Sequence, residues 1–189
     1  MLRVNRPDLP AALHSALDRW QQTVNKGEID GDPWKRFHER DRDTKNAILA
    51  LVKAMFYGKC AYCETPDADE LDHFWPKSPH TQNSFRGTPH YMFVWENLLL
   101  VCRKCNSFSC KGSRMTWDDG KPRLLNPCLD EPLHYFAIAV SYNSLLAAGQ
   151  LEPRGDLAQQ KQLRAEYTIR LLKLNERRLL VEGRLATLR

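Results

Sequence analysis

Four cysteines in two matched Cys-x-x-Cys pairs are the residues of this sequence best suited to bind a metal. The first pair is Cys60 and Cys63, and the second, Cys102 and Cys105, follows after 38 intervening residues. Thiolates are soft ligands, and four of them close a tetrahedral zinc site with no open position. We therefore predict one structural zinc ion, because a redox motif would not occur as two matched copies.

A second group of side chains could hydrolyse a phosphodiester. Asp72 and His73 lie between the two cysteine pairs, and Asn106 directly follows the second pair. Hydrolysis needs a general base for water and a cation beside the phosphate. His73 suits the base because imidazole titrates near neutral pH, whereas Asp72 and Asn106 offer hard oxygens that favour Mg²⁺ or Mn²⁺. Since a closed zinc site cannot activate water, this chemistry would need a separate catalytic metal.

The order of these motifs resembles the HNH nucleases. The first Cys-x-x-Cys is followed by Asp-His-Phe-Trp-Pro-Lys, then by Trp-Glu-Asn-Leu, and finally by Cys-x-x-Cys-Asn. The resemblance implies a ββα-metal fold, in which a two-stranded hairpin and a helix bind one divalent ion. It implies that His73 is the general base and that Asp72 and Asn106 are ligands of the catalytic metal. It also implies that Asn97 holds the loop carrying the base through backbone hydrogen bonds.

Segments outside this core resemble the PtuB-like branch of these nucleases, found in Septu and retron-linked anti-phage systems. These segments are Gly58–Glu64, Leu125–Cys128, Gly149–Pro153 and Leu174–Arg177. The resemblance implies a partner, a PtuA-like ABC/SMC-like ATPase, and nucleic acid as the target. DNA is the expected substrate, and RNA stays open because the HNH mechanism does not use a ribose hydroxyl.

One departure from the family pattern affects Lys111. Four residues separate Asn106 from Lys111, where the pattern Cys-Asn-x-x-Lys-Gly has two. The insertion leaves the role of Lys111 open and places Cys110 near the zinc site as an alternative ligand. The two-residue spacing of the second pair favours Cys105 over Cys110 as the zinc ligand.

Four cations near the expected helix could contact phosphates and so position a substrate without reading its sequence: Arg103, Lys104, Lys111 and Arg114.

Helices and strands must position these residues, and we predict an α+β protein. Its zinc-stabilised ββα-metal core would be flanked by N-terminal and C-terminal helices. Residues 1–58 predict helices, because apolar residues recur at three- and four-residue steps from Leu9 to Val24 and from Thr44 to Phe56. Residues 59–117 are the expected core. Within it we predict an exposed loop at 76–89, a buried strand within 91–101 and a short helix after Cys105.

Residues 118–189 are expected to form a connector and C-terminal helices. A short apolar run at 135–140 predicts a strand. Two helices are predicted at 156–174 and 175–188, with Asn175 as a cap of the second.

Composition limits the classes of protein this chain could be. With 189 residues, 42% of them hydrophobic, it can bury one core and a small satellite. The net charge of +5 is carried by residues 154–189 and suits either a phosphate-rich partner or a solvated helix surface. The sequence shows neither an 18-residue apolar run nor the apolar start of a signal peptide, so we expect a cytoplasmic protein that does not bind membranes.

Two other functions compete with that of a defence-complex nuclease. The chain could be a zinc-knuckle module that only binds nucleic acid or a partner, with a degenerate HNH site. It could also be a stand-alone, restriction-type HNH nuclease. The presence of the base, both oxygen ligands and the middle asparagine favours an enzyme over a binding module. Whether cleavage requires an ATPase distinguishes the two enzymes.

Overall fold

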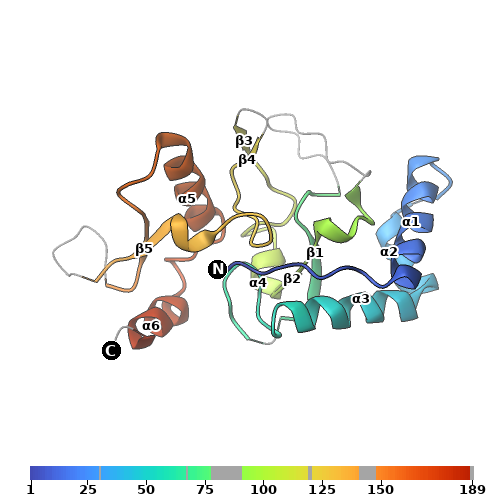
Figure 1. The fold of residues 1–189 in the computed structure, drawn as a ribbon, viewed down its shortest axis with the longest axis horizontal. Helices are drawn as coiled ribbons and strands as arrows, with labels where there is room; N and C mark the ends of the chain where they lie inside the picture. Colours follow the sequence, from blue (N-terminus) through green and yellow to red (C-terminus); the bar gives the residue numbers. More distant parts are fainter. Residues whose placement is uncertain (30, 67, 78–90, 119–120, 141–147, 188–189) are drawn as a thin grey trace.

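The structure is a computed structural model that describes all residues except 30, 67, 78–90, 119–120, 141–147 and 188–189. Helices α1 to α3 lie at one end of the molecule and α5 and α6 at the other, with a hairpin and the short α4 between them (Figure 1). This mixture of helices and small sheets confirms the predicted α+β class. Most of the loop predicted at 76–89 lies outside the described residues.

The N-terminal helices are α1 (Ala11–Asn25), α2 (Pro33–Arg40) and α3 (Arg42–Met55). α1 and α3 match the predicted helices, whereas α2 follows the turn-rich stretch without a prediction of its own. Asp32 caps α2, because its side chain accepts hydrogen bonds from the backbone N–H groups of Trp34 and Lys35 at 2.9 and 3.3 Å. Pro33 occupies the first helical position, where a missing N–H has no cost.

The central unit has the order strand, strand, helix. β1 (Glu70–His73) pairs antiparallel with β2 (Leu98–Val101), so that Asp72 lies opposite Leu99 and His73 opposite Leu98. A 3₁₀ turn, η2 (Trp95–Asn97), leads into β2, and all four residues of β2 are buried, as its continuous apolar run predicts.

The short helix of this unit is α4 (Arg103–Asn106). It contains Cys105 rather than following it, so the predicted start of this helix is wrong by a few residues. The reason is local, because the Asn106 N–H donates to the Cys102 carbonyl at 3.1 Å and closes the turn around the cysteine pair.

One hydrophobic core joins the parts of the chain that the sequence separates. Phe37 of α2 and Val52 of α3 are fully buried with Leu100 of β2, and α3 contacts β2. Leu172 and Leu174, which follow α5, belong to the same core. Burial of each such side chain contributes roughly 1.5–3 kcal/mol, so the hairpin depends on helices from both ends of the sequence.

The segment before α1 also fixes the hairpin. The Arg6 guanidinium donates to the backbone carbonyls of Trp95 and Leu98 at 2.8 and 2.9 Å, and it lies 4.8 Å from the centre of the Trp95 ring. The Trp95 indole N–H donates in turn to the Pro7 carbonyl at 3.0 Å. These bonds hold the start of β2 in place.

The C-terminal part contains two further hairpins and two helices. Its elements are β3 (Trp117–Asp118), β4 (Lys121–Pro122), η3 (Pro132–His134), β5 (Phe136–Ile138), β6 (Leu151–Pro153), α5 (Gln159–Leu171) and α6 (Arg178–Thr187). The predicted strand at 135–140 contains β5, which pairs with β6. Asn175 does not cap α6 but bonds through its side-chain amide to both backbone groups of Leu151, at 2.7 and 2.8 Å.

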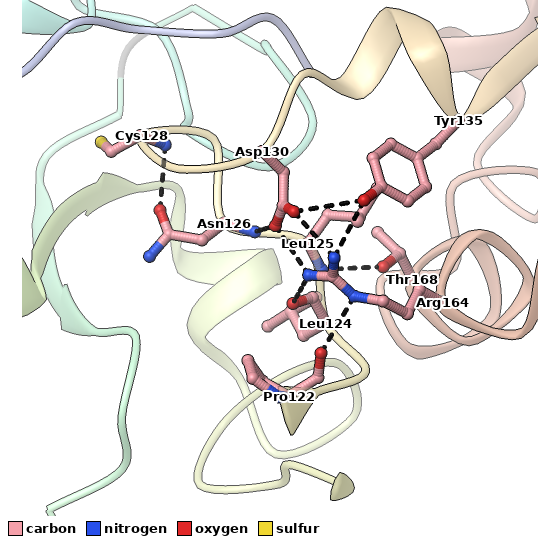
Figure 2. A network of polar contacts seen from close by, with 9 residues as sticks. All are labelled: Pro122, Leu124, Leu125, Asn126, Cys128, Asp130, Tyr135, Arg164 and Thr168. Atoms are coloured by element: carbon pink, nitrogen blue, oxygen red, sulfur yellow. Dashed lines mark hydrogen bonds and ion pairs between the residues drawn. The ribbon is translucent and has the colours of Figure 1, made fainter. Parts of the chain in front are cut away.

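Arg164 of α5 fixes the predicted connector (Figure 2). Its guanidinium forms a two-bond ion pair with Asp130 at 2.7 Å and also donates to the Pro122 carbonyl at 3.0 Å. Such paired geometry is the stronger kind of ion pair. Thr168, one turn later on α5, accepts a hydrogen bond from the backbone N–H of Leu125 at 3.1 Å. The connector is therefore held against α5.

Candidate active site and metal centre

The four cysteines of the two pairs meet at one point. The sulfur atoms of Cys60, Cys63, Cys102 and Cys105 all lie within 4.8 Å of one another, and those of Cys63 and Cys102 are 3.7 Å apart. Tetrahedral zinc with Zn–S bonds of about 2.3 Å separates its sulfurs by about 3.8 Å, so the cluster matches the size of a zinc site. These cysteines can hold a structural metal ion such as zinc.

Backbone hydrogen bonds shape the knuckle that carries Cys60 and Cys63. The Glu64 N–H donates to the Cys60 carbonyl at 2.9 Å, and Glu64 has a positive φ of 61°, which reverses the chain after the pair. The Ala61 N–H donates to the Leu100 carbonyl at 2.8 Å. This last bond ties the knuckle to β2, so the metal centre and the hairpin form one unit.

Cys110, the alternative ligand, lies outside the cluster. Its buried sulfur bonds to the Leu172 carbonyl at 3.9 Å and accepts a hydrogen bond from Arg177 at 3.1 Å. The spacing argument that favours Cys105 over Cys110 therefore agrees with the geometry.

His73 is buried at the end of β1. Its Nε2 lies 2.9 Å from the Met92 carbonyl, and its ring packs edge-on against Trp34 with centroids 4.3 Å apart. A carbonyl can only accept, so Nε2 carries the proton and Nδ1 holds the free lone pair. Burial and the nearby positive charge of Lys77 lower the pKa of His73 to about 3. The imidazole is thus neutral at physiological pH, but its lowered pKa makes it a weaker base than the near-neutral titration expected from the sequence would give.

This buried, neutral imidazole makes the stability of the protein depend on pH. As pH falls below 6.5, the ordinary pKa of histidine, the unfolded chain takes up a proton at His73, but the folded chain does not until about pH 3. Stability therefore falls as pH falls through this window, by up to ~1.4 kcal/mol per pH unit. We expect the free energy of unfolding, measured by urea titration from pH 6 to 4, to fall more steeply in the wild type than in His73→Gln. Parallel curves for the two proteins would contradict the buried neutral state.

Asp72 is held between a cation and a hydroxyl. The Lys111 ammonium lies 3.1 and 2.8 Å from its two carboxylate oxygens, and the Tyr62 hydroxyl donates to it at 3.2 Å. Burial and the charge of Asp72 raise the pKa of Tyr62, so its hydroxyl stays protonated. Lys111 also donates to the His73 carbonyl at 2.6 Å and is fully buried. A turn closed by the Cys110 N–H and the Ser107 carbonyl absorbs the two inserted residues, so Lys111 still reaches Asp72.

Loss of the Lys111 ammonium would leave the Asp72 carboxylate buried without a counter-charge. Breaking a buried pair on one side costs about 3–5 kcal/mol, so we expect Lys111→Met to lower the free energy of unfolding by that amount. The matched control is Lys104→Met, at an exposed position on α4, which should change stability by less than about 0.5 kcal/mol. Equal stability of the two variants in denaturant titrations would show that the ion pair has no net effect.

The two asparagines have different surroundings. The Asn97 side chain makes three backbone hydrogen bonds: it accepts from the Trp75 N–H at 2.7 Å, and it donates to the carbonyls of Trp75 and Tyr91 at 3.1 and 2.7 Å. These bonds fix the chain directly after His73. Asn106 instead donates to the Glu70 carboxylate at 2.8 Å, which orients its amide beside β1.

Asp72, His73 and Asn106 line one pocket of about 470 Å³. Its other wall comes from the N-terminal helices, through Trp34 and His38 of α2 and Lys45 of α3. Among the described residues, the cysteine cluster is the group of three or more Cys, His, Asp or Glu side chains whose ligand atoms lie close enough together to hold a metal ion.

Several lining residues were missed by reasoning from the sequence. Glu70 and Lys77 line the pocket with Lys45 and His38. Glu70 had a detectable signal, because it precedes Asp72 by two residues and alternate residues of a strand share a face. The helical residues had none, since nothing local in α2 or α3 indicates that these helices pack beside β1.

The four cations expected to contact substrate occupy different places. Arg103 and Lys104 are exposed on α4, whereas Lys111 is buried beside Asp72. Arg114 lines a second pocket of about 450 Å³, together with Arg170 and Lys173 near the end of α5. The structure therefore groups Arg103 and Lys104 on the surface and separates them from the other two.

Comparison with known proteins identifies relatives in one defence system. A Septu protein PtuB of Bacillus mycoides (strain KBAB4) is 33% identical over 114 residues, which cover 49% of this chain and 37% of that protein. A Septu protein PtuB of Bacillus thuringiensis is 26% identical over 183 residues, or 93% of this chain and 55% of that protein. The chain is therefore similar in sequence to these two PtuB proteins. No family model matches it.

The chain spans only about half the length of the relative that it matches most extensively. In the described part of the chain, no helix combines the length and apolar character needed to cross a membrane.

Proposed function

We propose that this chain is a metal-dependent HNH endonuclease that acts as the nuclease subunit of an anti-phage defence complex. The observation that carries the proposal is the shared pocket of Asp72, His73 and Asn106 beside a hairpin and a short helix. A neutral imidazole and oxygen donors in one pocket are what hydrolysis of a phosphodiester requires. Similarity to Septu PtuB supports the defence role.

The residues take roles that follow from their contacts. His73 accepts the proton of the attacking water at Nδ1, because its Nε2–H is engaged by the Met92 carbonyl. Asn97 keeps the chain around His73 in place through its bonds to Trp75 and Tyr91. Lys45 and Lys77 line the same pocket and supply positive charge for a phosphate, and Arg103 and Lys104 contact the nucleic-acid backbone from α4.

The oxygen donors suit a hard divalent cation. Asp72 and Asn106 would hold Mg²⁺ or Mn²⁺, with Glu70 orienting the Asn106 amide. When bound, the cation would neutralise charge on the phosphate and on the leaving oxygen. The buried Lys111 forms an ion pair with Asp72 and fixes the position of that carboxylate, a role different from the phosphate contact expected for it.

The experiment that tests the function is cleavage of supercoiled plasmid DNA, with Mg²⁺ or EDTA and with or without a PtuA-like ATPase. We expect nicking that requires Mg²⁺ and that increases with the ATPase, because the resemblance implies a two-component system. Cleavage at the same rate with and without the ATPase would favour a stand-alone nuclease. Absence of cleavage on plasmid and on RNA, together with retained binding, would favour the zinc-knuckle binding module.

A further inference from the structure

The C-terminal part of the chain places a buried arginine against the metal centre. Arg177 lies between α5 and α6 and is only 8% exposed. Both of its terminal nitrogens lie 3.4 Å from the Cys105 sulfur, and one of them lies 3.1 Å from the Cys110 sulfur. These contacts join residues 72 and 67 positions apart in the sequence.

The charge of a four-cysteine zinc centre explains why a guanidinium should lie there. Four thiolates and Zn²⁺ carry a formal net charge of about −2, and a buried charge is costly unless it is compensated. A guanidinium stays protonated in proteins and donates through a rigid fork, so it needs a negative partner when buried. The carboxylate next to it in sequence, Glu176, is 3.7 Å from the Lys173 ammonium, whereas the terminal nitrogens of Arg177 contact the two sulfurs.

Cys110 completes the connection between the knuckle and α5. It accepts from Arg177 and contacts the Leu172 carbonyl, directly after the end of α5. Leu172 and Leu174 are themselves buried in the main core. The junction between α5 and α6 is thus fixed by apolar packing and by one cation directed at the cysteine cluster.

We propose that Arg177 is a hydrogen-bond donor to the zinc-binding sulfur of Cys105. In this position it compensates the negative charge of the zinc centre and couples metal binding to docking of the C-terminal helices. Arg177 donates to the Cys105 sulfur, and the loaded cluster in turn supplies the counter-charge for a buried guanidinium. Loss of zinc releases the two cysteine pairs from each other, so the Cys105 sulfur is no longer held beside Arg177 and the packing of residues 159–187 weakens. The proposal does not depend on nuclease activity.

The test compares Arg177→Met with Arg178→Met, because Arg178 is the adjacent arginine but is 87% exposed and pairs with Glu182 on the surface. Zinc affinity is measured by competition with a chromogenic chelator on the purified full chain. We expect Arg177→Met to bind zinc about 10–100-fold more weakly, Arg177→Lys to recover part of the loss, and Arg178→Met to match the wild type. Affinity of Arg177→Met within twofold of the wild type would overturn the proposal.

A second measurement needs no variant and so covers the case in which Arg177→Met does not fold. Hydrogen exchange of the wild type is followed before and after removal of zinc by EDTA. We expect the amides of residues 159–187 to lose protection together with those of β1 and β2 when zinc is removed. Unchanged protection of α5 and α6 in the zinc-free protein would show that their docking is independent of the metal centre.

Discussion

Replacement of His73 by alanine is expected to reduce cleavage of supercoiled plasmid by at least about 100-fold in the presence of Mg²⁺, because a positioned general base contributes about 10²–10⁴-fold. The Nε2–H of the neutral imidazole donates to the Met92 carbonyl, which leaves Nδ1 as the atom that can accept a proton. His73 lines the pocket directly beside Asp72 on β1. The rate of nicking is measured at saturating Mg²⁺ for both proteins at equal zinc content.

The control for this experiment is His14→Ala, since His14 is exposed on α1 and pairs with Asp18 four residues later. That variant should cut at the wild-type rate. His73→Ala should retain zinc, because His73 is not among the four residues of the metal cluster. If His73→Ala cleaves at a rate within about threefold of the wild type, His73 is not the base.

Replacement of Cys60 by serine is expected to have the largest effect on stability. Structural zinc contributes directly to folding, with apparent binding energies of about 10–16 kcal/mol in small zinc domains. Loss of a metal belongs to the few mechanisms that cost more than ~4 kcal/mol, which for a chain of this length lowers Tm by roughly 8–16 °C. Zinc content by metal analysis and Tm by calorimetry should fall together, and EDTA should reproduce the fall in the wild type.

A matched cysteine outside the cluster separates loss of zinc from loss of a thiol. Cys128 is half-buried, contacts Arg6 at 3.4 Å and is not part of the four-cysteine cluster. Cys128→Ser should therefore keep its zinc. A Cys60→Ser protein with full zinc content and an unchanged melting temperature would remove Cys60 from the metal centre.

Much of the candidate site could be predicted because its signals are local. The two Cys-x-x-Cys pairs fix the ligand type and number, and the Asp72–His73 step places an acid and a base on one short strand. The regular apolar spacing of α1 and α3 likewise predicts those helices, since side chains three and four residues apart share a helical face. The helix α2 lies within the region predicted to be helical but was not predicted as a separate helix. Its local signals are the capping residue Asp32 and Pro33 at the first helical position.

The sequence by itself determined the chemistry of this protein: four thiolates for one metal, an imidazole, and oxygen donors beside it. Only the tertiary structure decided what surrounds these groups, because burial and counter-charges come from residues distant in the chain. Lys111 reaches Asp72 across 39 positions, and Arg177 reaches Cys105 across 72. Trp34 of α2 packs on His73 and helps to bury it, and that burial keeps the imidazole neutral. Residue types and short spacings are written in the sequence, whereas desolvation and charge pairing depend on how the helices pack.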